Sequence, residues 1–151
     1  MPNKLLLVSR VQQQAESDCL PACAQMVLAY LGKIVEYKRL LQLLRTRSFG
    51  TPAANILYLN QLGVRDSLRE FVVNEIEKQI DANRAVIAFL NTADLPYWKQ
   101  DTDHAVVVIG FDGEDILLND PFYAEQTQKV SHAAFELAQL RFNHLCATIE
   151  L

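Results

Sequence analysis

Apolar residues recur at helical spacing through the first half of the chain, which predicts a series of short helices. Glycines end two of these patterns, since Gly32 and Gly63 each follow the last apolar residue. A lead-in strand is expected over Leu5 to Val11. The four predicted helices run from about Cys19 to Gly32, from Tyr37 to Leu44, from Thr51-Pro52 to Gly63 and from Asn74 to Ala82.

The second half changes to short runs rich in β-branched and aromatic residues, which predict strands. One further helix is expected near Ala133 to Leu140. Helices followed by antiparallel strands are typical of the α+β class, and this length suits one core. We therefore predict a single domain over residues 1–151, with an N-terminal helical half packed on a C-terminal antiparallel sheet. The predicted strands are Ala85 to Leu90, Ala105 to Phe111, Ile116 to Asn119 and Cys146 to Ile149.

Composition narrows the class of protein further. The net charge of −4 comes from scattered residues, and without a basic face we expect no nucleic-acid partner. No segment of the sequence is apolar for long enough to span a membrane, and the apolar run near the N-terminus is too short for a secretory signal. The three cysteines, an odd number, make a poor disulfide framework. These features predict a cytoplasmic protein with free thiols.

Three side chains suited to nucleophilic catalysis occur at the ends of predicted elements. Cys19 starts the first helix, which Ser17 or Asp18 can cap, and His104 opens the apolar run of a strand. Asp120 follows the next strand. A thiol attacks as the thiolate, which a helix N-terminus and a nearby imidazolium both stabilise, and a carboxylate can orient the imidazole. The set predicts a Cys-His-Asp catalytic triad.

The remaining cysteines fit a protein core better than a reactive site. Cys23 lies one helical turn after Cys19 in an apolar stretch, and Cys146 lies in the closing strand. Cys19 and Cys23 lack the Cys-x-x-Cys spacing of a redox or zinc half-site, and the sequence offers no second pair of ligands. We therefore predict no metal ligands and no organic cofactor.

Other polar residues compete with members of this triad. His132 and His144 lie in polar surroundings and are expected on the surface. Asp103, directly before His104, is a second carboxylate that could orient the imidazole in place of Asp120. The segment Asp112 to Asp115 is predicted to join the two strands on either side of it as a hairpin. The geometry of this hairpin decides which carboxylate can reach the histidine.

The triad requires Asp120 and His104 on the same face of the sheet, because side chains alternate along a strand. A two-residue turn at Gly113-Glu114 would put them on opposite faces. A three-residue turn puts them on one face, and the register that sets Asp120 opposite Val106 makes it a diagonal neighbour of the histidine. We therefore predict an odd-length loop or a bulge near Gly113, and a hydrogen bond between the Asp120 carboxylate and the His104 ring.

With Gln13 added, these residues resemble the bacteriocin-processing peptidases. Those are papain-like domains that cleave leader peptides after a double glycine in peptide-exporting ABC transporters. The chain resembles even more their free-standing relatives, since this sequence carries no exporter. The resemblance covers about residues 8–122 and implies a papain-like fold. The matching segments are Gln13, Asp18-Cys19, Met26 to Gly32, His104 to Gly110 and Asn119-Asp120-Pro121.

The resemblance also implies a role for each site residue. The nucleophile would be Cys19, the general base His104, the orienting group Asp120 and a donor to the oxyanion hole Gln13. Gln12 and Gln14 stay open as alternatives for the last role.

The predicted function is hydrolysis of a peptide bond in a peptide or protein substrate, which for this family includes leader peptides. Leu20 departs from the exporter pattern, because exporter domains usually have glycine directly after the cysteine. The backbone N–H is kept, but the added isobutyl group can reshape the cleft, so the preference for a double glycine stays open. Two alternative functions also stay open: a catalytically silent peptide-binding module, and an amide or acyl transferase that uses the same triad.

Overall fold

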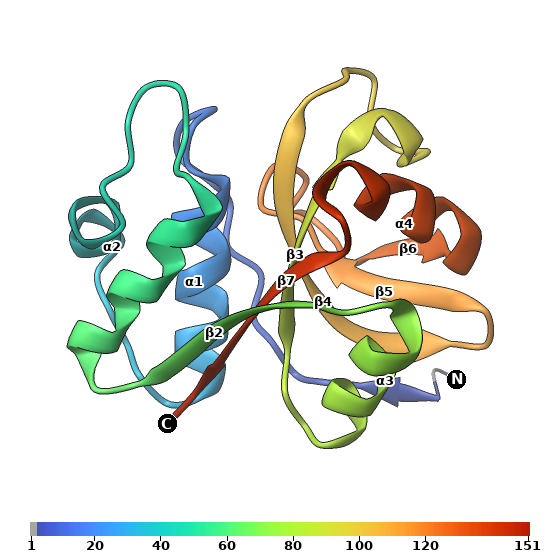
Figure 1. The fold of residues 1–151 in the computed structure, drawn as a ribbon, viewed down its shortest axis with the longest axis horizontal. Helices are drawn as coiled ribbons and strands as arrows, with labels where there is room; N and C mark the ends of the chain where they lie inside the picture. The colour runs from blue at the N-terminus through green and yellow to red at the C-terminus, as the bar shows by residue number, and fades with distance from the viewer. Residues whose placement is uncertain (1–2) are drawn as a thin grey trace.

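A helical group and a twisted antiparallel sheet lie side by side in the computed structural model, which describes residues 3–151 (Figure 1). The helical group contains α1 (Cys19–Tyr30), α2 (Tyr37–Leu43) and the 3₁₀ segment η1 (Ala53–Leu62). The strands are β1 (Lys4–Leu5), β2 (Arg65–Glu70), β3 (Val86–Asn91), β4 (Asp103–Asp112), β5 (Asp115–Asn119), β6 (Gln128–Ser131) and β7 (Leu145–Glu150). The sheet side also carries α3 (Val73–Asp81), η2 (Thr92–Asp94), α4 (His132–Gln139) and η3 (Leu140–Phe142).

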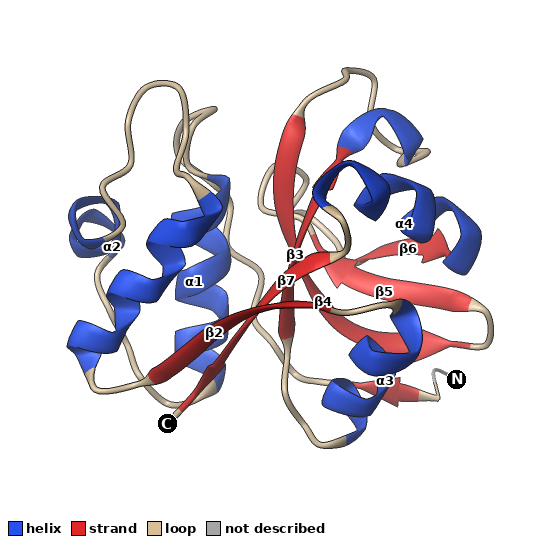
Figure 2. Cartoon of the chain, in the orientation of Figure 1, coloured by secondary structure: helices blue, strands red, loops and turns tan. Residues whose placement is uncertain are grey.

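The sheet has the strand order β2-β7-β3-β4-β5-β6, and β1 also pairs with β4. Each of these pairings is antiparallel. At one end, β2 and β7 reach out toward the helical group, where β2 contacts η1 (Figure 2). On the sheet itself, α1 packs against β4 and α4 packs against β3, so every residue of β3 is buried. The predicted arrangement of a helical half on an antiparallel sheet is confirmed.

One hydrophobic core joins the two halves. Leu28 of α1 and Leu40 of α2 are fully buried in the same cluster as Val107 of β4 and Phe135 of α4. The interface between the two halves, here called the seam, is therefore tightly packed. This packing fixes the positions of the residues at its open, solvent-accessible end. Within residues 3–151, no helix is long and apolar enough to cross a membrane.

Several predicted elements differ in the structure. The segment over residues 53–62 is a 3₁₀ helix rather than an α-helix, in keeping with its apolar residues at Ile56, Leu59 and Leu62, which repeat every three positions. The lead-in strand is shorter than predicted, since β1 covers only Lys4–Leu5. The strands β2 and β6 were not predicted. β2 is a polar edge strand, and β6 is only four residues long.

The register of the β4–β5 hairpin was predicted in part. The prediction was an odd-length loop or a bulge; the turn is the two-residue loop Gly113-Glu114, and the structure has the bulge instead. A bulge at Ile109 supplies the missing shift, and its carbonyl accepts a hydrogen bond from the Leu6 N–H at 2.8 Å. Beyond the bulge Asn119 pairs with Val107, which puts the next residue, Asp120, on the face of the sheet that carries His104.

Candidate active site

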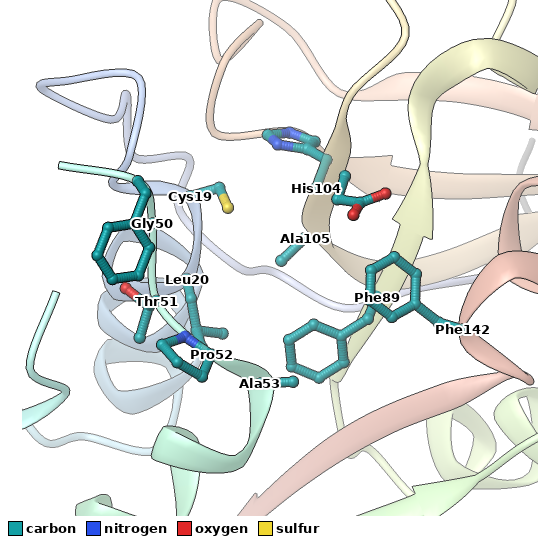
Figure 3. Close-up of a pocket in the computed structure, with 12 residues that line it drawn as sticks. Cys19, Leu20, Gly50, Thr51, Pro52, Ala53, Phe89, His104, Ala105 and Phe142 are labelled. Atoms are coloured by element: carbon teal, nitrogen blue, oxygen red, sulfur yellow. The ribbon is translucent and has the colours of Figure 1, made fainter. Parts of the chain in front are cut away.

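Cys19 and His104 face each other across the open end of the seam (Figure 3). Cys19 is the first residue of α1 and is partly exposed, whereas the residues after it, from Leu20 to Ala24, are buried in the core. His104 is the second residue of β4, and only 6% of it is exposed. The first turn of α1 and the start of β4 thus hold an accessible thiol beside a buried imidazole.

The His104 ring is hydrogen-bonded to Asp120, as predicted. Nε2 of His104 lies 2.7 Å from Oδ1 of Asp120, and the carboxylate is fully buried. Oδ1 also accepts the Phe122 N–H at 2.9 Å. Oδ2 accepts the Tyr97 hydroxyl at 2.7 Å and the Trp98 indole N–H at 2.8 Å. Both carboxylate oxygens are fully engaged, so the carboxylate has little freedom to turn away from the histidine.

The pKa values of this pair favour the charged forms of both groups. Burial lowers the pKa of His104, but hydrogen bonds to Asp120 and Cys19 and the negative charges of both outweigh it, and the pKa is raised to about 9. Burial raises the pKa of Asp120, but its hydrogen bond with His104 and the imidazolium charge lower it below its usual value. At neutral pH the site therefore holds an imidazolium next to a carboxylate, and Cys19 lies beside the imidazolium.

Sequence reasoning missed Tyr97 and Trp98, which come from the loop between η2 and β4. The Trp98 ring meets the His104 ring edge-on, with centroids 4.8 Å apart, and also contacts Phe122 at 4.8 Å. These aromatic rings shield the buried ion pair from water. The available signal was the adjacent Tyr97-Trp98 pair, which includes the one tryptophan of the chain, within a polar segment.

The competing residues do not take part in this arrangement. Asp103 accepts a hydrogen bond from Asn91 at 3.2 Å, and it is Asp120 that is bonded to the His104 ring. His132 pairs with Glu136 at 3.6 Å, and neither His132 nor His144 lines the cleft beside Cys19. Both are partly buried rather than fully on the surface. Asp103 is a cleft residue, but it is not bonded to the histidine.

The other two cysteines are core thiols, as predicted. Cys23 is fully buried, and its Sγ lies 3.4 Å from the Ala105 carbonyl oxygen. Burial, and then the charges of Cys19 and Asp120, raise the pKa of Cys23 well above its usual value. Burial likewise raises the pKa of Cys146 to about 12. Both thiols therefore stay protonated at neutral pH.

The Cys23→Ala variant is expected to lose stability and keep its reactivity. Removing a buried sulfur leaves a small void and should cost roughly 1–2 kcal/mol in the free energy of unfolding. Urea unfolding of the variant and the parent measures this cost, and alkylation of Cys19 by iodoacetamide should proceed at the parent rate. A variant as stable as the parent but unreactive would contradict the assignment of Cys23 to the core.

Of the three consecutive glutamines, Gln13 is the buried one, while Gln12 and Gln14 are exposed. The Gln13 backbone N–H donates to the Pro121 carbonyl at 2.8 Å, which ties this loop to the segment after Asp120. Its side-chain Nε2 donates to the carbonyls of Ala15 at 2.8 Å and Glu16 at 3.2 Å. Both amide hydrogens are thus in use, so a role as oxyanion donor requires one of them to be released.

Ser17 and Asp18 were the two alternative caps predicted for α1. The structure puts Asp18 at the N-cap, but its side chain makes no capping hydrogen bond. Its carboxylate instead accepts the Tyr37 hydroxyl at 3.0 Å and the Ser17 hydroxyl at 3.3 Å. The Tyr37 oxygen in turn accepts the Gln14 N–H at 3.1 Å. Asp18 therefore joins the glutamine loop to α2, and it fixes the approach of the chain to Cys19.

A thiol at the start of a helix that faces a histidine on an antiparallel sheet defines a papain-like fold. The model of the Peptidase_C39-like family matches residues 5–146, nearly the whole chain. The protein therefore belongs to the Peptidase_C39-like family. A search of curated proteins gave no match.

Solved structures of C39-type peptidases share this fold. A Bacillus anthracis protein classed as a C39-like peptidase matches with a TM-score of 0.81 at 18% identity, over 99% of this chain and 98% of that one. The peptidase domain of Streptococcus ComA, a bi-functional ABC transporter of a quorum-sensing pathway, gives 0.78 at 19% identity, over 95% and 98%. A double glycine motif protease from an AMS/PCAT transporter, in complex with its leader peptide, gives 0.76 at 20% identity, over 98% and 94%.

Proposed function

We propose that this protein is a cysteine peptidase that hydrolyses a peptide bond with Cys19 as its nucleophile. The observation that carries the proposal is the buried His104–Asp120 pair, at 2.7 Å, beside a partly exposed thiol at the start of α1. Membership of a peptidase family and the fold shared with C39-type peptidases support a peptidase. Structural ion pairs can also be buried, but one that ends at a reachable thiol in a cleft favours catalysis.

The proposed reaction follows from which ring nitrogen is free. Since Nε2 of His104 is bonded to Asp120, Nδ1 is the nitrogen that carries the proton of Cys19 in the reactive thiolate–imidazolium pair. The thiolate attacks the substrate carbonyl, and Nδ1 then gives its proton to the departing amine as the carbon–nitrogen bond breaks. A water molecule, deprotonated by His104, attacks the resulting thioester, and the carbon–sulfur bond breaks to release the acid and restore the Cys19 thiolate and the imidazolium. Asp120 stabilises the imidazolium in both halves of the reaction.

The proposed oxyanion hole is formed by backbone N–H groups at the start of α1 and by the Gln13 amide. Such donors are aimed at charge that develops in the transition state, and losing one typically costs about 2.7–4 kcal/mol of barrier. The burial of Gln13 and its hydrogen bonds to Ala15 and Glu16, in the segment that leads into Cys19, support this role. A substrate oxyanion would replace one of its two carbonyl partners.

The Gln13→Ala variant is expected to lower kcat by about 10²- to 10³-fold and to change KM little, because an oxyanion donor acts mainly in the transition state. Gln12→Ala and Gln14→Ala are the matched controls, and both should stay near the parent. Alkylation by iodoacetamide forms no oxyanion, so its rate should be unchanged in Gln13→Ala. A loss of alkylation in parallel with kcat would mean that Gln13 only supports the fold of the loop.

The proposed substrate is a peptide or an unfolded segment of a protein, including a leader peptide. The leader peptide bound to the AMS/PCAT transporter protease supports this class of substrate. The test is incubation of the protein with a mixture of synthetic peptides, with and without prior alkylation by iodoacetamide, followed by mass spectrometry. Cleavage that alkylation of Cys19 prevents is the expected result. Binding without cleavage would instead indicate a silent peptide-binding module, and amide products formed with an added amine would indicate a transferase.

A further inference from the structure

A cleft of about 300 Å³ opens beside Cys19 and His104, between α1 and the sheet (Figure 3). Apart from these two side chains, its polar lining comes from Thr51 and Asp103. The carboxylate of Asp103 already accepts a hydrogen bond from Asn91. The rest of the lining is mainly apolar and comes from both halves of the molecule, so the cleft is suited to a carbon-rich group.

Leu20 forms part of the floor of this cleft without filling it. Only 1% of Leu20 is exposed, and the volume of about 300 Å³ is what remains with its side chain in place. The opposite wall is formed by Phe89 and Phe142, whose ring centroids are 6.5 Å apart (Figure 3). Ala53, at the start of η1, also lines the cleft. The isobutyl group of Leu20 is therefore taken up almost entirely by the core and leaves the cleft open.

The rim of the cleft carries an exposed aromatic residue. Phe49 also lines the cleft, and 83% of it is exposed. It lies in a tight turn in which Arg47 and Gly50 exchange two backbone hydrogen bonds of 3.0 Å. Phe49 therefore extends the apolar lining of the cleft out to its solvent-exposed rim.

We propose that this cleft binds a large apolar side chain of the substrate, leucine or larger, within two residues of the scissile bond. The inference rests on the proposed peptidase function, and it names the class of peptide that the enzyme selects. Two glycines present no side chain to occupy this volume, so a double-glycine segment would leave the apolar walls in contact with water. Filling an apolar pocket discriminates between side chains by about 10- to 200-fold.

The test compares quenched fluorogenic peptides that differ only at the two positions on each side of the scissile bond, which carry glycine, leucine or phenylalanine. The parent should show a kcat/KM about 10- to 200-fold higher for leucine or phenylalanine than for glycine at one of these positions. Ala53→Phe places a ring in the cleft and should bring this ratio close to one. Ala54→Phe is the matched control, since Ala54 is exposed and outside the cleft, and it should keep the parent ratio.

A second variant tests the same cleft independently, in case Ala53→Phe does not fold. Phe142→Ala removes part of the wall and should lower the ratio by about tenfold or more. Cleavage that depends on Cys19 but proceeds equally well with glycine, or better, would overturn the apolar subsite and leave the peptidase function standing. An unchanged ratio in both variants would also overturn it. If no peptide is cut in a Cys19-dependent manner, the proposed function fails first.

Discussion

The Cys19→Ala variant is expected to lose all measurable peptide hydrolysis while keeping the parent fold. Removing the nucleophile of a triad enzyme typically costs on the order of 10⁶-fold in kcat. The side chain is partly exposed at the first position of α1, so the loss of one sulfur removes little packing. The free energy of unfolding should therefore stay within about 1 kcal/mol of the parent.

The measurement is hydrolysis of a peptide that the parent cleaves, together with urea unfolding of both proteins. Cys23→Ala and Cys146→Ala are the matched controls, because each also removes one thiol but from a buried position. Both controls should hydrolyse the peptide after correction for the folded fraction. Activity that survives in Cys19→Ala and disappears in Cys23→Ala would move the nucleophile to the second cysteine.

The parts of the fold that follow from a repeating pattern were predictable from the sequence. The helix α1 is apolar over most of its length and is closely followed by Gly32, so its C-terminal end could be predicted within two residues. The buried strands β3 and β4 are continuous apolar runs. By contrast, β2 is polar along an edge, and its pairing with β7 is a long-range contact that no local pattern encodes.

The hairpin illustrates why part of the site could only be predicted in outline. The predicted triad required that Asp120 and His104 lie on the same face of the sheet. This condition predicted a shift in the register between the two strands of the hairpin. The shift lies where β1 pairs with β4, and the Leu6 N–H, directly after β1, bonds the carbonyl of the bulged Ile109. At Gly110 a side chain would collide with the Lys4 carbonyl oxygen, so this close crossing requires glycine.

The surroundings of the carboxylate were the least predictable part of the site. Tyr97 and Trp98 lie in a loop without periodicity, and their bonds to Asp120 depend on how that loop folds back over the sheet. The hydrogen bonds that the Gln13 amide makes within its own loop could not be predicted from the sequence either. Residue types and spacing could suggest the triad, but the partners that hold it follow from tertiary structure.

The Asp120→Asn variant is expected to lower kcat/KM by about 10²- to 10⁴-fold and to shift its pH dependence. In the parent, the alkaline limb of the profile should have an apparent pKa near 9, because activity requires the His104 imidazolium, whose pKa is raised to about 9. Asparagine removes the negative charge but keeps the size of the side chain. Burial then lowers the pKa of His104 with less opposition, so the alkaline limb should move to lower pH.

The same substitution should change how stability depends on pH. The pKa of His104 is raised from 6.5 to about 9, so its contribution to the free energy of unfolding is complete below pH 6.5 and is lost as the pH rises through 9. The pKa of Asp120 is lowered from 3.8, so its contribution is present above that pH and is lost as the pH falls further. The parent should exceed Asp120→Asn in stability most clearly between about pH 4 and 6.5.

Two further variants make this test specific to Asp120. Asp112→Asn removes one carboxylate charge at an exposed ion pair with Lys129 and should leave both the rate and the alkaline limb near the parent. Asp103→Asn tests the neighbouring carboxylate, which is bonded to Asn91 rather than to the histidine. Two outcomes would contradict the role of Asp120 as the group that orients His104 and raises its pKa. One is a larger loss of kcat/KM in Asp103→Asn than in Asp120→Asn, and the other is an alkaline limb in Asp120→Asn that stays near pH 9.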